Sequence, residues 1–251
     1  EFNIGLKFIS PLVLPYINIK KSLIVMSQKI YLMSLLLCCL STWSYAQTEV
    51  TIKDADLQGN QTYSWTNDKV YLLDGYVFLE AGSKLTIQAG TVIKGINTPT
   101  NGVDKASALI ITRGAQIFAE GTKDAPIIFT AELDDVTDPT DLTAADKGLW
   151  GGVIILGNGI VGEDGGFDNI EGIPADEGRA QYGGDQADDN SGIIRYVSIR
   201  HGGAALQADN EINGLTLGGV GSATQIDHIE VFANEDDGIE WFGGNVDVKY
   251  A

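Results

Sequence analysis

The chain has 251 residues and a formal net charge of −18, because 34 Asp and Glu residues outnumber 16 Lys and Arg residues. So acidic a protein is a poor partner for nucleic acid, since phosphate binding requires clustered Lys and Arg. Its 44% of hydrophobic residues is enough to fill a core, which excludes general disorder. The length allows one large domain or two small ones.

The charge is distributed unevenly along the chain. The first 46 residues hold four basic residues and a single acid, Glu1. From Gln47 onward the chain therefore has 12 basic and 33 acidic residues, a net charge of −21. Thirty of the 31 glycines also lie in this second part. The two parts differ so much in composition that we expect them to have different roles.

The stretch 26–46 has the pattern of a signal peptide. Met26 and Lys29 give it a positively charged start, an apolar run follows at 35–40, and small residues precede the expected cleavage point after Ala46. The apolar run is shorter than the roughly 20 residues that a transmembrane helix needs. A membrane anchor is the alternative, which polar residues near the end of the stretch disfavour. We therefore expect a mature chain without a transmembrane span, secreted or held at the outer-membrane surface.

Residues 1–25 fit neither part of the chain. They lack an initiating Met and precede the two candidate starts, Met26 and Met33, so we interpret them as upstream sequence translated in frame. Both cysteines, Cys38 and Cys39, fall inside the predicted signal peptide. The mature chain is then free of cysteine, and no disulfide stabilises it.

The apolar stretches after residue 47 are short, rich in β-branched residues and closed by Gly, Asn or Asp. This pattern predicts strands and turns rather than helices. The predicted strands are, in chain order, Val70–Leu73, Tyr76–Leu79, Lys84–Ile87, Thr91–Lys94, Leu109–Thr112, Ile127–Thr130, Val153–Leu156, Ile193–Arg200, Leu215–Leu217, Ile226–Phe232, Ile239–Phe242 and Val246–Tyr250. They indicate an all-β fold for residues 47–251.

Parts of this strand pattern recur along the chain. The apolar spacing of residues 194–199 returns at 226–231, an offset of 32 residues. A second motif, an apolar residue, two spacers, Gly and then Ser or Thr, contains Gly82, Gly90 and Gly121, which lie 8 and then 31 residues apart. Recurrence at such spacing is typical of stacked supersecondary units.

The recurrence favours a solenoid of short strands, a right-handed parallel β-helix over residues 47–251. One coil cannot bury its inward face alone, whereas stacked coils bury a continuous apolar column. Continuous apolar strands such as Val153–Leu156 suit parallel pairing, in which both faces of the sheet are covered. An antiparallel sandwich or jelly roll remains the alternative, but it does not explain the recurrence. Because a strand-like alternation runs up to Ala251, we expect the solenoid to be truncated there.

Several stretches resemble coils of a known family when taken as a set. They are residues 85–93 (L-x-I-x-x-G-T-x-I), 121–130 (G-T-x-x-x-P-I-x-F-T), 150–155 (W-G-G-V-I-I) and 234–240 (N-E-D-D-G-I-E). The chain from about Trp65 onward is similar to secreted right-handed parallel β-helix repeat proteins of Bacteroidetes-type bacteria, which are often type IX secretion substrates. The resemblance implies a fold and a compartment, and it brings no established activity.

Three acidic or polar segments interrupt the strands, at 97–105, 132–147 and 163–190. Insertions in a solenoid form loops, often on the face that binds a ligand. The alternative, which we favour, is that such charge runs are solvated surface loops. The most compact cluster, Glu235, Asp236 and Asp237, is a weak candidate for Ca²⁺ because it supplies oxygen ligands. It matches neither an EF-hand nor the nonapeptide repeat, and a structural turn is the favoured alternative.

An enzyme hypothesis rests on Asp236, Asp237 and His201. They resemble the Asp-Asp and Gly-His-Gly motifs of polygalacturonases, a resemblance that implies a carboxylate pair for hydrolysis. The departures are serious, since Arg200 replaces the Gly before His201 and adjacent strand residues point to opposite sides. With only two histidines in the chain, at 27 residues' separation, no zinc site is expected.

The candidate ligand-binding residues are Trp241, Phe242 and Arg200. The aromatic pair would form a platform for sugar rings, and Arg200 would contact an acidic group. The leading hypothesis is a secreted or cell-surface scaffold that is structural or binds a polysaccharide or cell-surface glycan, without cofactors except weak Ca²⁺. A polysaccharide lyase or glycoside hydrolase is the first alternative, and an adhesin is the second. We lean against an enzyme, because no convergent catalytic set is evident in the sequence.

Overall fold

The structure, a computed structural model, describes residues 47–207 and 210–251. The predicted signal peptide (26–46), with both candidate start methionines, lies outside the described residues, and so does the segment 1–25. The chain from Gln47 to Ala251 packs together as one unit, in agreement with the change of composition near residue 46.

Strands and turns make up almost all of the described chain. Every predicted strand is present, with ends that differ by two residues at most. The elements are β1 (Thr48–Ile52), the 3-10 helix η1 (Asp54–Leu57), β2 (Thr62–Trp65), β3 (Lys69–Leu73), β4 (Tyr76–Leu79), β5 (Lys84–Ile87), β6 (Val92–Gly95), β7 (Ala108–Ile111), β8 (Gln116–Glu120), β9 (Ile127–Ala131), β10 (Val153–Leu156), β11 (Asp168–Asn169), the 3-10 helix η2 (Gly178–Ala180), β12 (Gln181–Tyr182), β13 (Gly192–Arg200), β14 (Ala205–Gln207), β15 (Asn210–Glu211), β16 (Leu215–Gly218), β17 (Gln225–Phe232), β18 (Ile239–Phe242) and β19 (Val248–Lys249).

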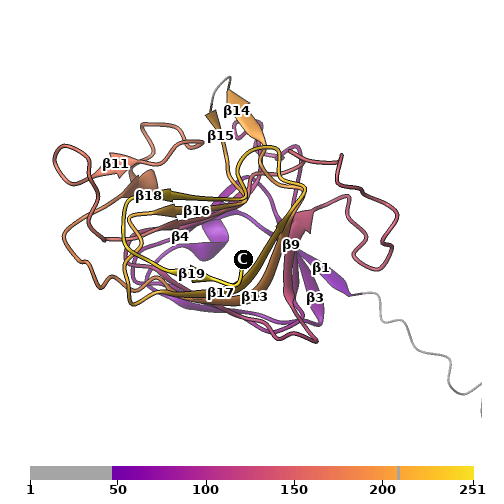
Figure 1. Ribbon diagram of the computed structural model, residues 1–251. Helices are drawn as coiled ribbons and strands as arrows, with labels where there is room; N and C mark the ends of the chain where they lie inside the picture. The colour runs from indigo at the N-terminus through magenta and orange to yellow at the C-terminus, as the bar shows by residue number, and fades with distance from the viewer. Residues whose placement is uncertain (1–46, 208–209) are drawn as a thin grey trace, which may run out of the picture. The chain divides into compact units, whose positions relative to one another are not determined.

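Parallel pairing winds the strands into a right-handed parallel β-helix with three faces, as the recurrence predicted (Figure 1). Face 1 contains β2, β5, β8, the N-terminal halves of β13 and β17, and β19. Face 2 contains β1, β3, β6, β9 and the C-terminal halves of β13 and β17. Face 3 is a separate sheet in the order β18, β16, β10, β7, β4. The chain visits the faces in this order in every coil.

The shortest coil takes 22 residues, since Thr62 pairs with Lys84 on face 1. The 32-residue recurrence is confirmed by the register, in which Ile194 pairs with Ile226. It corresponds to a coil lengthened by about ten residues, because the chain between β13 and β16 carries the hairpin β14–β15. The solenoid therefore has a 22-residue unit with insertions, and 32 is one of its lengthened forms.

A single left-handed residue joins face 1 to face 2 in the later coils. Tyr196 in β13 has φ 47° and His228 in β17 has φ 54°, and Tyr250 after β19 has φ 57°. The three rings stack along the helix axis, with centroid distances of 4.3 Å between Tyr196 and His228 and 4.6 Å between His228 and Tyr250. Because the corner takes only one residue, β13 runs unbroken across both faces.

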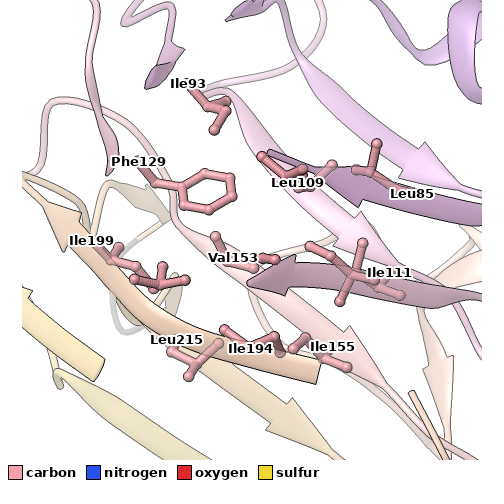
Figure 2. Packing of buried hydrophobic residues seen from close by; sticks show 14 of the residues in the cluster. Leu85, Ile93, Leu109, Ile111, Phe129, Val153, Ile155, Ile194, Ile199 and Leu215 are labelled. Carbon is pink, nitrogen blue, oxygen red and sulfur yellow. The ribbon is translucent and has the colours of Figure 1, made fainter. Parts of the chain in front are cut away.

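The interior is an apolar column to which all three faces contribute alternate side chains. Figure 2 shows Phe129 of face 2 pointing toward Leu109 and Val153 of face 3. Face 3 is buried on its outer side as well, which explains why Val153–Leu156 is apolar at every position.

The outer side of face 3 is covered by residues 157–191, which connect β10 to β13 and are called here the cover segment. Its buried side chains are Ile170, Ile173, Ala180 and Tyr182. Arg179 also fixes it, with its guanidinium 4.0 Å from the centroid of the Phe78 ring. The prediction of a solvated loop at 163–190 is therefore wrong for its apolar residues, because they form a second core with face 3.

Candidate functional site

A cleft of about 320 Å³ lies between the outer side of face 2 and the loop that connects β9 to β10. We call it the acidic cleft, because carboxylates predominate among its charged groups. It is lined by Asp134, Asp135, Val136, Asp138, Pro139, Asp141, Leu142, Arg200, His201, Glu230 and Phe232. Two residues that the sequence singled out, Arg200 and His201, are thus brought together here with others that it did not.

Arg200 ends strand β13 and projects into the acidic cleft. Its Nε donates to the Ser198 hydroxyl at 2.8 Å, and its guanidinium lies 3.7 Å from the Glu230 carboxylate. Its backbone carbonyl accepts the indole N–H of Trp150 at 2.7 Å, which fixes the end of the strand. The side chain is 30% exposed, so that part of its donor capacity faces solvent. This arrangement suits an arginine that holds a polar ligand.

His201 follows Arg200 in a left-handed conformation, with φ 58°, and is 3% exposed. Its Nδ1 contacts the carbonyl oxygen of Asp146 at the end of the acidic loop. Its ring meets Phe232 edge-on, with 5.7 Å between centroids. The imidazole therefore forms the floor of the cleft and anchors the loop above it.

The loop's aspartates are arranged in local turns. Asp135 accepts hydrogen bonds from the backbone and hydroxyl of Thr137, and Asp138 does the same with Thr140. These bonds lower the pKa of both carboxyl groups below the ordinary value. The aspartates therefore stay charged and give the cleft a negative wall.

Glu235, Asp236 and Asp237 occupy the exposed turn between β17 and β18. Glu235 pairs with Lys147 at 3.2 Å, and the Asn234 amide donates to the Asp237 carbonyl at 2.8 Å. These contacts are those of the structural turn. Within residues 47–207 and 210–251, no group of three or more His, Cys, Asp or Glu side chains is placed to hold a metal ion.

The structure does not join the three residues of the enzyme hypothesis. In the described part of the chain, no hydrogen bond or ion pair connects the His201 ring to the carboxylate of Asp236 or Asp237. The ring of His201 belongs to the acidic cleft, whereas Asp236 lies near Glu171 of the cover segment, to which it adds a repulsive charge.

Trp241 and Phe242 lie on opposite sides of β18, as strand alternation dictates. Trp241 pairs in register with the core residue Leu217 and is 47% exposed. Phe242 packs on the outer side of face 3, 6.0 Å from the Tyr182 ring. The two aromatic side chains therefore do not form one platform.

Phe232 is the aromatic residue that the sequence analysis missed. It is 40% exposed and lines the acidic cleft beside Arg200. The signal that would have found it is the 32-residue recurrence, because Phe232 pairs in register with Arg200 one coil earlier. Glu230 follows by the same rule, since it pairs with Ser198.

Parallel coils, a cover segment over one face and a loop-walled cleft on another define a β-helix protein with a surface binding site. The family model for the pectate-lyase-like β-helix domain matches residues 58–251, and the chain belongs to that family. No curated protein and no solved structure matches the chain. Among the residues that the structure describes, no helix is long and apolar enough to cross a membrane.

Proposed function

We propose that the protein is a secreted or cell-surface scaffold that binds a glycan in the acidic cleft. The observation that carries the proposal is the pairing of Arg200 with the exposed ring of Phe232 on neighbouring coils. Sugar hydroxyls donate to carboxylates and accept from a guanidinium, while an aromatic ring packs on the apolar side of a sugar. The cleft offers all three kinds of contact.

Binding without turnover is the form of the function that the contacts support best. A general acid or base must reach the reacting atoms with a free titratable group. The ring of His201 is buried and its Nδ1 contacts the Asp146 carbonyl. The exposed carboxylates Asp236 and Asp237 lie on the turn between β17 and β18, outside the lining of the cleft.

Export is the second part of the proposal. It is supported by the signal-peptide pattern at 26–46, by the absence of cysteine after that stretch and by the resemblance to type IX secretion substrates of Bacteroidetes-type bacteria. Fractionation of cells that express the full gene tests it. Recovery of the protein only in the cytosol, with residues 26–46 still attached, would contradict it.

Binding can be measured by affinity electrophoresis and calorimetry against neutral, amine-bearing and uronate polysaccharides. We expect Phe232→Ala to weaken binding by about two- to tenfold, and Arg200→Ala to weaken it as well. The matched control is Arg195→Ala, because Arg195 lies on the same strand, is similarly exposed at 34% and pairs with Asp227 of the next coil.

Two results would contradict the glycan-binding proposal. One is equal loss of binding in the Arg195 and Arg200 variants, which would place the glycan outside the cleft. The other is turnover, detected as new reducing ends or unsaturated product, that is lost in Asp237→Ala. That second result would establish the enzyme in place of the scaffold.

A further inference from the structure

Two glutamates from distant parts of the chain meet beside face 3, outside the acidic cleft. Glu171 belongs to the cover segment and Glu240 to β18, and their carboxyl groups lie within hydrogen-bonding reach of each other. The side-chain amide of Asn213, which precedes β16, contacts both. Its Nδ2 lies 3.3 Å from Glu171 Oε1 and 2.5 Å from Glu240 Oε2.

The two carboxylates have no basic partner. No Lys or Arg in the described chain forms a salt bridge with Glu171 or Glu240. Asp236 on the neighbouring turn adds a further negative charge. Partial burial, followed by the charge of Glu240, raises the pKa of Glu171. Like charges held this close repel each other, so a cation between them would stabilise the arrangement.

Asn213 supplies an independent sign of a ligand. Its side chain is fully buried, and its Oδ1 has no hydrogen-bond partner. A buried carbonyl oxygen without a partner is costly and needs an explanation. A half-turn of the amide directs this oxygen at Glu171 and Glu240, where it adds a third oxygen ligand to the two carboxylates.

We propose that Glu171, Glu240 and the Asn213 amide oxygen bind one Ca²⁺ ion, with water completing its shell. Ca²⁺ accepts carboxylates in one- or two-oxygen contact, amide oxygens and irregular geometry, whereas Mg²⁺ demands a near-octahedral shell. The exposed Glu171 leaves one side open to water. The ion ties the cover segment to β18 and to the connection before β16. This site differs from the cluster Glu235–Asp237 that the sequence suggested.

The test compares single carboxylate-to-amide variants of the purified chain after removal of divalent ions. In the unchanged protein, millimolar Ca²⁺ raises the Tm by a few degrees and slows proteolysis within 157–191, and Mg²⁺ has a smaller effect. Glu240→Gln abolishes both responses and weakens Ca²⁺ binding in calorimetry by at least about tenfold, because the charge of the ligand set controls affinity. Glu171→Gln does the same at an exposed position where folding is not at risk.

Glu235→Gln is the matched control, since it removes one exposed acid from the neighbouring turn. It is expected to keep the full Ca²⁺ response. Loss of the response in Glu235→Gln, with its retention in Glu240→Gln, would overturn the proposal in favour of the turn. A Tm and a proteolysis rate that Ca²⁺ does not change in the unchanged protein would overturn both sites. The result does not depend on whether the acidic cleft binds a glycan.

Discussion

The corner before β13 allows a sharp test of the coil geometry through Gly192→Ala. Gly192 has φ 115°, a conformation that side chains rarely adopt, and it pairs in register with Ile117. A Cβ there would overlap the carbonyl oxygen of Ile117 and lie 2.8 Å from its carbonyl carbon. Backbone strain of about 1–3 kcal/mol adds to the loss of one or two ladder hydrogen bonds at about 1 kcal/mol each. We expect a destabilisation of roughly 3–4 kcal/mol by this reasoning.

Two further Gly-to-Ala variants separate the backbone strain from the overlap. Gly59 has φ 80° with no atom within 4 Å of a Cβ, so Gly59→Ala carries the strain alone, about 1–2 kcal/mol. Gly162 has neither feature, and Gly162→Ala is expected to change stability by less than about 1 kcal/mol. Stability is measured by denaturant unfolding with equal m values. If Gly192→Ala is no less stable than Gly59→Ala, the close pairing of β8 with β13 is refuted.

Three other predictions concern the core, the cover segment and the corner. Trp150→Phe removes the indole donor to the Arg200 carbonyl at a fully buried site, and it should cost about 1–3 kcal/mol in denaturant unfolding. The hydrogen bond from Arg179 lowers the pKa of Glu177 below its ordinary value of 4.5, so this pair stabilises the cover segment above that pH and loses its contribution as the pH falls through the lowered value. Proteolysis within 157–191 should therefore accelerate in acid, and Glu177→Gln should remove that part of the pH dependence. At the corner, His228→Ala loses the ring stack but keeps the left-handed backbone, whereas His228→Gly loses the stack and relieves the strain. We expect the Ala variant to be the less stable by about 1 kcal/mol, and the reverse order in thermal melts would contradict this account of the corner.

The parts of the fold that follow local rules were predictable from the sequence. Short β-branched runs closed by Gly and Asp became strands, and the shared spacing of residues 194–199 and 226–231 became a register. The 22-residue unit was not evident, because most coils carry insertions of different length. Strand β8 was also missed, although its residues 118–120 belong to a recurring motif, since mixed polar and apolar spacing hides a strand whose outer side is solvated.

The candidate site was predictable only where it depends on sequence neighbours. Arg200 and His201 are adjacent in the chain and do share the acidic cleft. Trp241 and Phe242 are adjacent as well, but strand alternation separates them. Glu171 and Glu240 meet only because the cover segment folds over face 3, a long-range contact that local spacing does not encode. Acidic composition alone therefore could not distinguish the turn-forming aspartates from the unpaired glutamates.

The corner between faces 1 and 2 shows how one fold position tolerates residues that local rules disfavour. A left-handed Tyr or His costs roughly 1–2 kcal/mol, and glycine would avoid that cost. Each residue at this corner instead stacks on the one in the next coil, and an aromatic pair contributes about 0.5–1.5 kcal/mol. His228 is sandwiched between Tyr196 and Tyr250, so it gains two such contacts. The strain of each residue is thus offset by its neighbours along the axis, and the stabilisation exists only because the coils repeat.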